Sequence, residues 1–189
     1  MTTLCGIQGK DFVVLAADSQ ITEDNLRTIS LTTPKIIRKG RYLLGITGDT
    51  RPGDILTYNW NPPAIPRNTD PVQHMGKRVI PSIIDALTTN GYHNFNNNDD
   101  KDGGFDYLLA FNAQLFHIAC DLSFIQSHLD YYGIGSGGQF ATGFLWQKVR
   151  KGISKKEAME LADLAIRCAE TFDINTREPV QLVVQERGK

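Results

Sequence analysis

Short runs of apolar residues divide the first part of the chain into elements typical of β-strands. Residues 3–8 and 12–17 are two such runs, and Gly9-Lys10-Asp11 between them is a turn signal that predicts a hairpin. The second run is apolar at every position, as expected for a strand covered on both faces. A second hairpin is predicted over residues 36–46, around Lys39-Gly40. Because both hairpins precede any long helical pattern, we expect an antiparallel sheet.

Helical patterns follow in two groups. The first covers residues 72–87, with a kink expected at Pro81. A proline-rich stretch over residues 59–71 excludes a helix there, because proline lacks the N–H and restricts its predecessor. The second group consists of a helix over residues 138–150 and one that opens at a Ser154–Glu157 capping box.

Further strands are predicted between and after these helices. A third hairpin covers residues 105–122 with its turn at Asn112-Ala113, and a last strand covers residues 180–184. Residues 90–104 are rich in Asn, Asp and Gly, the composition of a surface loop. Two antiparallel sheets with helices in two separate groups fit a four-layer αββα sandwich. We therefore predict an α+β fold of this architecture, in a single domain over residues 1–189.

Composition narrows the class of protein. The apolar fraction of 41% is typical of a globular chain, and a net charge of −1 gives no reason to expect nucleic acid or an anionic membrane surface as a partner. The three cysteines lack a framework spacing and fit a reducing compartment. We expect no transmembrane helix, no signal peptide and no propeptide beyond Met1. These features predict a cytoplasmic protein.

The first candidate for chemistry is Thr2. Methionine is usually trimmed before a small residue, so loss of Met1 would make Thr2 the N-terminus. An N-terminal threonine carries a hydroxyl nucleophile and a base, its own α-amine, on one residue. That amine titrates near ~7.7–8.0, so a useful neutral fraction exists at cytoplasmic pH. The four histidines show no catalytic or metal-ligand spacing, and we predict neither a metal nor a cofactor.

Three further positions are expected close to Thr2. Asp18 ends the second strand and emerges beside the start of the first, and Lys35 is the cation expected to pair with it. Such an ammonium would depress the pKa of the amine and stabilise negative charge on the hydroxyl oxygen. Gly48 follows a strand, and its N–H is a candidate oxyanion donor. A strand-end salt bridge and a simple turn glycine are the alternative interpretations.

The glycine-rich segment 133–138 matches no common nucleotide-binding or hydrolase motif. Its spacing fails both the P-loop and the dinucleotide patterns. Ser136 also lacks the pair of glycines, two residues away on either side, that a hydrolase nucleophile elbow requires. Ser136 is therefore interpreted as a supporting hydroxyl.

Taken in order, these positions resemble those of proteasome β subunits. The matching features are Thr2-Thr3, the strand that ends at Asp18, Lys35 followed by two isoleucines, Thr47-Gly48, Gly135-Ser136-Gly137 and Asp173. The chain is also similar to the bacterial threonine peptidase that works with a hexameric ATPase. The resemblance spans residues 2–184 and implies the fold of the N-terminal nucleophile hydrolases.

The resemblance implies a threonine-type endopeptidase. Thr2 would be nucleophile and base, Asp18 and Lys35 the charged pair that tunes it, and Gly48 the oxyanion donor. Walls formed by Ile21, Ile46 and Thr50 would favour apolar substrate side chains.

Supporting residues are implied as well. Ser136 and Asp173 would hold the amine and hydroxyl of Thr2 by hydrogen bonds. Thr176 stands where the family has a second hydroxyl residue, although Arg177 and Glu178 replace the glycines that usually follow it.

The resemblance also implies partners. These are polypeptide substrates, a homo-oligomeric ring and an ATPase unfoldase. The helices over residues 72–87 and 154–172 are the expected ring contacts, and the prolines of residues 59–71 shorten the family's contact helix.

Two other functions fit parts of the sequence. A catalytically inactive ring or scaffold subunit would keep the fold, and retention of Met1 would favour it because an acylated N-terminus removes the base. An amidohydrolase acting on small amides usually begins with Cys or Ser, and Cys5 lies too far from the start. Peptide hydrolysis is the preferred hypothesis.

Overall fold

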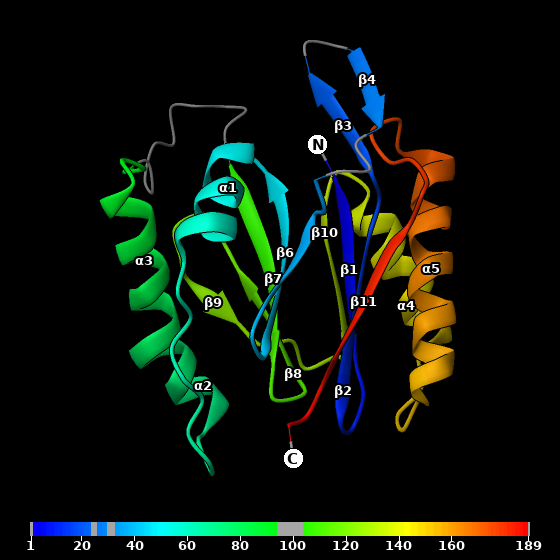
Figure 1. Ribbon diagram of the computed structural model, residues 1–189. Coiled ribbons are helices and arrows are strands. Elements are labelled where there is room, and N and C mark those ends of the chain that lie inside the picture. The colour runs from blue at the N-terminus through cyan, green and yellow to red at the C-terminus, as the bar shows by residue number, and fades with distance from the viewer. Residues whose placement is uncertain (1, 24–25, 30–32, 94–103, 189) are drawn as a thin grey trace.

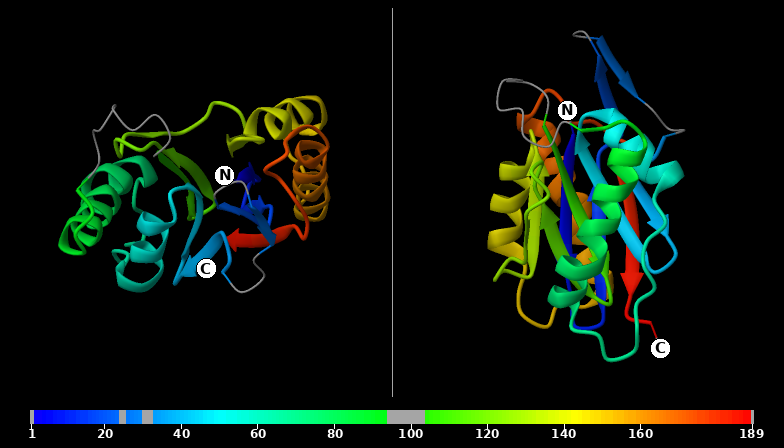
Figure 2. Two further views of the ribbon diagram at one scale, coloured as in Figure 1. Left: turned by 90° about the horizontal axis from the view of Figure 1, so that it is seen from above. Right: turned by 90° about the vertical axis from the view of Figure 1, so that its left-hand side faces the viewer.

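In a computed structural model, the chain forms a sandwich of two antiparallel sheets between two layers of helices (Figure 1). The structure describes residues 2–23, 26–29, 33–93 and 104–188. Most of the loop predicted over residues 90–104 lies outside these ranges. The view from above shows the sheets facing each other and the helices on their outer faces (Figure 2). The predicted α+β sandwich is therefore confirmed.

The first sheet has the strand order β10-β1-β2-β11. Its strands are β1 (Thr3–Gln8), β2 (Phe12–Ala17), β10 (Tyr131–Gly135) and β11 (Gln181–Glu186). The second sheet has the order β5-β6-β7-β8-β9. Its strands are β5 (Ile36–Lys39), β6 (Tyr42–Gly48), β7 (Phe105–Phe111), β8 (Gln114–Ile118) and β9 (Phe124–Ile125). The two predicted N-terminal hairpins thus lie in different sheets.

Burial on both faces explains the uninterrupted apolar run in β2. Val14 and Ala16 pack beneath the helices of the first sheet. Val13 and Leu15 point the other way, into the layer between the two sheets. Successive strand residues face opposite sides, so a strand in this position needs apolar residues throughout.

The first sheet is covered by α4 (Gly138–Lys148) and α5 (Lys155–Phe172). The Oγ of Ser154 caps α5 by accepting a hydrogen bond from the Glu157 N–H at 3.2 Å. This agrees with the N-terminus that the capping box predicts.

The second sheet is covered by α1 (Thr50–Asn59) and by one longer helix. The longer helix begins as α2 (Pro71–His74), continues through the π-helical turn η1 (Met75–Val79) and ends as α3 (Ile80–Thr89). Pro81 lies in the first turn of α3, just after the π-helical turn. A wider turn accommodates a residue that lacks an N–H, so the irregularity expected at Pro81 takes this form.

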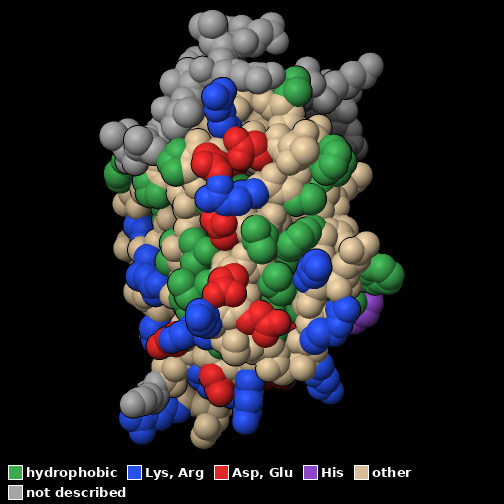
Figure 3. Space-filling view, turned by 90° about the vertical axis from the view of Figure 1, so that its right-hand side faces the viewer, with side chains coloured by type: hydrophobic (Ala, Val, Ile, Leu, Met, Phe, Trp, Pro, Cys, Tyr) green, Lys and Arg blue, Asp and Glu red, His purple; other side chains and the backbone are tan. Residues whose placement is uncertain are grey.

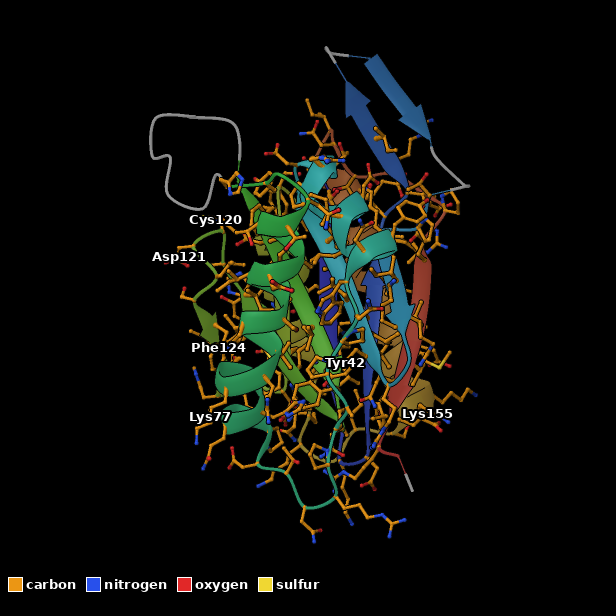
Figure 4. The ribbon with its side chains drawn as sticks, turned by 60° about the vertical axis from the view of Figure 1, so that its left-hand side comes forward. Tyr42, Lys77, Cys120, Asp121, Phe124 and Lys155 are labelled. Atoms are coloured by element: carbon orange, nitrogen blue, oxygen red, sulfur yellow. The ribbon has the colours of Figure 1, made fainter. Side chains whose placement is uncertain are left out.

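The proline-rich stretch after α1 is not helical, as predicted. Tyr42, labelled in Figure 4, ties it to the second sheet by donating a hydrogen bond to the Pro63 carbonyl at 2.9 Å. Its hydroxyl also lies 2.7 Å from Nε2 of the buried His74. A side chain from the sheet therefore anchors a segment whose prolines cannot donate backbone hydrogen bonds.

Several strands were not predicted from the sequence. The hairpin of β3 (Gln20–Glu23) and β4 (Leu26–Ile29) extends beyond the body of the sandwich, and its short, polar strands carry no apolar run (Figure 1). The strand β10 contains two glycines, which are uncommon in strands. The strand β8 ends at Ile118, short of the predicted Leu122.

None of the helices in the described part of the chain has the length and apolar character that a membrane-spanning helix needs.

Candidate active site

The candidate residues meet at one end of the two sheets. Thr2 directly precedes β1, Asp18 directly follows β2, and antiparallel pairing of these strands sets Leu4 opposite Ala17. On the other side of β1, Thr3 lies opposite Gly135, which brings Ser136 beside Thr2. The remaining candidates reach the same end of the molecule because Lys35 precedes β5, Gly48 ends β6, and Asp173 and Thr176 follow α5.

Asp18 is a buried carboxylate with several donors. Its Oδ1 accepts from Lys35 Nζ at 2.7 Å and from the Thr3 N–H at 2.9 Å. Its Oδ2 accepts from the N–H groups of Gln20 at 2.9 Å and Arg177 at 3.3 Å. The Asp18 side chain is 0% exposed and that of Lys35 only 11%. The predicted pair is therefore a nearly solvent-free ion pair.

Lys35 has an altered pKa. Burial lowers the pKa of its ammonium, while the attraction and hydrogen bond of Asp18 and the charge of Asp173 act in the opposite direction without cancelling the effect of burial. The same side chain lines a pocket together with Thr2. Thr2 thus shares a pocket with a cation whose side chain is largely buried.

A second polar cluster surrounds Asp173. Its Oδ2 accepts hydrogen bonds from Ser136 Oγ at 2.7 Å and from Thr176 Oγ1 at 2.6 Å. Its Oδ1 accepts from the Asn175 N–H at 3.1 Å. Burial alone would raise the pKa of Asp173, but the hydrogen bonds from Thr176, Ser136 and Asn175 outweigh it and hold the pKa below its ordinary value. Asp173 is thus an acceptor-only carboxylate that orients two hydroxyl groups.

The contact of Ser136 with Thr2 differs from the one implied by the resemblance. The Ser136 N–H donates to the Thr2 carbonyl at 3.0 Å, and Ser136 Oγ lies 3.5 Å from the same oxygen. We expected contacts to the amine and hydroxyl of Thr2, but the Thr2 nitrogen is an amide while Met1 is attached. The carbonyl contact also explains Gly135, whose φ is +84° and whose Cβ, were it present, would lie 2.0 Å from the Thr2 oxygen.

A pocket of about 140 Å³ opens beside Thr2. The three residues predicted as its walls, Ile21, Ile46 and Thr50, all line it. Gly48 lines it too and has a φ of +87°, and a Cβ there would lie 1.9 Å from the Gly104 carbonyl oxygen. Only glycine fits this position, because a side chain would collide with the backbone that faces it.

Sequence reasoning missed two carboxylates in this pocket. Asp49 and Asp54 line it, and Asp54 follows Thr50 by four residues in α1. Residues four apart share a helix face, so this spacing was a usable signal once Thr50 was chosen as a wall. Sequence reasoning also gave no role to Thr3, whose buried hydroxyl oxygen lies 2.5 Å from that of Thr176.

Comparison with known proteins finds proteasome subunits. The family model of the proteasome subunit matches residues 109–184. A probable proteasome subunit beta type-2 of Schizosaccharomyces pombe is 28% identical over 199 residues, covering 100% of this chain and 68% of the relative. The proteasome subunit beta 2 of Korarchaeum cryptofilum is 38% identical over 55 residues, covering 29% of this chain and 28% of the relative. The chain is thus similar over its whole length to a proteasome β subunit.

Comparison with solved structures confirms the fold of this chain. The BPH protein of Thiobacillus denitrificans has a TM-score of 0.76 at 23% identity, with 98% of both chains covered. The HslV protein of Trypanosoma brucei has a TM-score of 0.67 at 20% identity, covering 97% of this chain and 99% of HslV. These structures share the fold of this chain, and the matching proteasome sequences agree with the resemblance drawn from the order of motifs.

Proposed function

We propose that this proteasome relative is a threonine-type endopeptidase whose nucleophile is Thr2 after removal of Met1. The observation that carries the proposal is the position of Thr2, which shares one pocket with Lys35 and Gly48 and lies beside the buried Asp18–Lys35 pair. Thr2 Oγ1 would attack the peptide carbonyl carbon while its proton passes to the α-amine and on to the departing amine. Water, with the amine again as base, would then hydrolyse the ester and restore the hydroxyl.

The neighbouring residues have matching roles in this proposal. The Lys35 ammonium would favour the neutral amine and stabilise charge that develops on Thr2 Oγ1. The N–H of Gly48 would bind the oxyanion. Ser136, Asp173 and Thr176 would fix the main chain of Thr2 through the carbonyl contact of Ser136.

The pocket charges suggest a substrate class. Lys35 is neutralised by Asp18, so Asp49 and Asp54 leave excess negative charge around walls that are otherwise apolar. We therefore propose polypeptide substrates that present Lys or Arg on the acyl side of the cut bond. Their aliphatic stems would contact Ile46 and their charged ends the carboxylates. This revises the apolar preference expected from Ile21, Ile46 and Thr50 alone.

A ligand of one structural relative supplies a probe. The BPH protein has been solved in complex with epoxomicin, in a structure with a TM-score of 0.75 and 21% identity to this chain. If the Thr2 pocket is the active site, epoxomicin should bind here, block peptide cleavage and fail to bind when the pocket is altered.

The proposal includes a homo-oligomeric ring, with an ATPase unfoldase as a further partner. The helices of the first sheet expose several large apolar side chains to solvent, and Figure 3 shows apolar patches among charged groups on this face. They are Phe140, Trp146, Met159, Leu164 and Phe172. Native mass spectrometry should give multiples of the 21.1 kDa chain. A 21 kDa monomer that still cleaves peptides would overturn the ring.

The decisive experiment combines intact mass with activity. Protein that has lost Met1 should cleave fluorogenic peptides, and Thr2→Ala should abolish cleavage while leaving the circular dichroism unchanged. The matched control is Thr88→Ala, which removes the same hydroxyl from a partly exposed site on α3, away from the pocket. Cleavage by a folded Thr2→Ala sample would refute the nucleophile, and retained Met1 without turnover would favour the inactive scaffold subunit.

A further inference from the structure

We propose that Thr3, through its hydroxyl, is a positioning residue that links the two polar clusters of the site. The inference rests on the proposed function, and it concerns the residue after the nucleophile. Thr3 is fully buried at the start of β1 and touches both clusters, one with its main chain and the other with its side chain.

The main chain of Thr3 holds Asp18. The Thr3 N–H donates to Asp18 Oδ1 at 2.9 Å, and the Asp18 N–H donates to the Thr3 carbonyl at 3.1 Å. The same Oδ1 binds Lys35 Nζ. The carboxylate that fixes the lysine is therefore itself oriented by the residue next to Thr2.

The side chain of Thr3 reaches the other cluster in a defined direction. Thr3 Oγ1 lies 2.5 Å from Thr176 Oγ1, which lies 2.6 Å from the Asp173 carboxylate. A carboxylate only accepts, so the single proton of the Thr176 hydroxyl is directed to Asp173. The Thr3 hydroxyl must then donate to Thr176. Charge-assisted bonds of this kind polarise the hydroxyl behind them, which strengthens the whole row.

The row ends on the nucleophile residue. Asp173 Oδ2 also accepts from Ser136 Oγ at 2.7 Å, and the Ser136 N–H binds the Thr2 carbonyl at 3.0 Å. Thr3, Thr176 and Asp173 are 0%, 3% and 8% exposed, so water is poorly placed to replace a lost hydroxyl. Loss of the Thr3 hydroxyl would free the Thr176 rotamer, weaken its bond to Asp173 and loosen Ser136 beneath Thr2.

The test compares variants that separate the hydroxyl from the shape of the side chain. Thr3→Val keeps the shape and removes the hydroxyl, whereas Thr3→Ser keeps the hydroxyl and removes the methyl group. We expect Thr3→Val to lower kcat roughly 10-fold with KM nearly unchanged, because the pocket stays intact while the nucleophile is less well placed. Thr3→Ser should retain most of the activity.

The pKa of Asp173 distinguishes positioning from a purely structural role. With a weaker bond from Thr176, the pKa of the Asp173 carboxyl should rise in Thr3→Val. A structural role alone would lower Tm and leave both kcat and this pKa in place. In Thr176→Val the defect should be as large, and the double variant should be no worse than Thr176→Val.

Three results would overturn the inference: a Thr3→Val enzyme with the wild-type kcat and Asp173 pKa, fully additive effects of the two Val substitutions, or a Thr3→Ser enzyme as impaired as Thr3→Val. If Thr3→Val does not fold, Thr3→Ser and Thr3→Ala isolate the hydroxyl instead. Carbon-13 titration of the Asp173 carboxyl needs no turnover, and its pKa should be higher in Thr3→Ala than in Thr3→Ser. An inactive wild-type enzyme with this pKa difference would refute the proposed function alone, and equal pKa values would refute the inference.

Discussion

Replacement of Lys35 by methionine tests the ion pair on which the site depends. Lys35→Met keeps the length of the side chain and removes its charge, leaving the fully buried Asp18 without its cation. Breaking a buried pair by removing one partner costs about 3–5 kcal/mol. The backbone N–H groups of Thr3, Gln20 and Arg177 still bind the Asp18 carboxylate, so we expect the lower end, about 3 kcal/mol at pH 7. For a domain of this size, that is a fall in Tm of about 6–12 °C.

The matched control is Lys155→Met. Lys155 lies at the surface, labelled in Figure 4, and pairs with Glu186 at 2.6 Å, but the two side chains are 51% and 63% exposed. Exposed pairs contribute about 0–1 kcal/mol, so this variant should unfold within about 2–4 °C of the wild-type protein. Scanning calorimetry should show a larger fall in Tm for Lys35→Met than for Lys155→Met. Equal losses in the two variants would refute the buried-pair argument.

Three further predictions follow from the same geometry. Lys35→Arg should keep a positive charge and still lose most peptidase activity, because a planar guanidinium differs from an ammonium in shape and hydration; a near wild-type kcat would contradict this. Joint replacement of Asp49 and Asp54 by asparagine should lower kcat/KM for Lys or Arg substrates roughly 10-fold and leave Leu substrates nearly unaffected, and an equal loss on both would argue against charge recognition. Asp173→Asn should destabilise the protein at neutral pH. The folded pKa of Asp173 is below its unfolded value near ~3.9, so the stability difference from wild type should persist above about pH 4 and disappear as the pH falls through the folded pKa. A difference that is constant from pH 7 to pH 2 would disprove the stated cause.

The sequence predicted most of the fold because its strands are buried. Residues 12–17 and 105–111 are strongly apolar, and burial on both faces of a central strand leaves that mark on any sequence. The strand β10 escaped detection because its glycines carry no such pattern, although it supplies the backbone that faces Thr2. The strand β3 was missed because its four residues, Gln20–Glu23, form no apolar run.

The sequence predicted which residues form the candidate site better than it predicted which atoms they contact. Asp18 and Lys35 lie at strand ends, and strand ends can be located in the sequence, so their meeting was foreseeable. The direction of a hydrogen bond cannot be read from spacing, and Ser136 accordingly contacts the carbonyl of Thr2 rather than its amine. Asp54 was overlooked although it follows Thr50 by four residues and so lies on the same face of α1, which lines the pocket.

The backbone pairing of β1 on both sides fixes the position of the proposed nucleophile, Thr2, independently of its side chain. Bonds to β2 and β10 fix the strand from Thr3 onward, and Ser136 fixes the carbonyl of Thr2 itself. None of these bonds uses the Thr2 side chain. A serine or a cysteine at position 2 would therefore occupy the same place, and the choice among them would be settled by reactivity and by the efficiency of Met1 removal. The fold would thus allow the proposed nucleophile to be exchanged without a change in architecture.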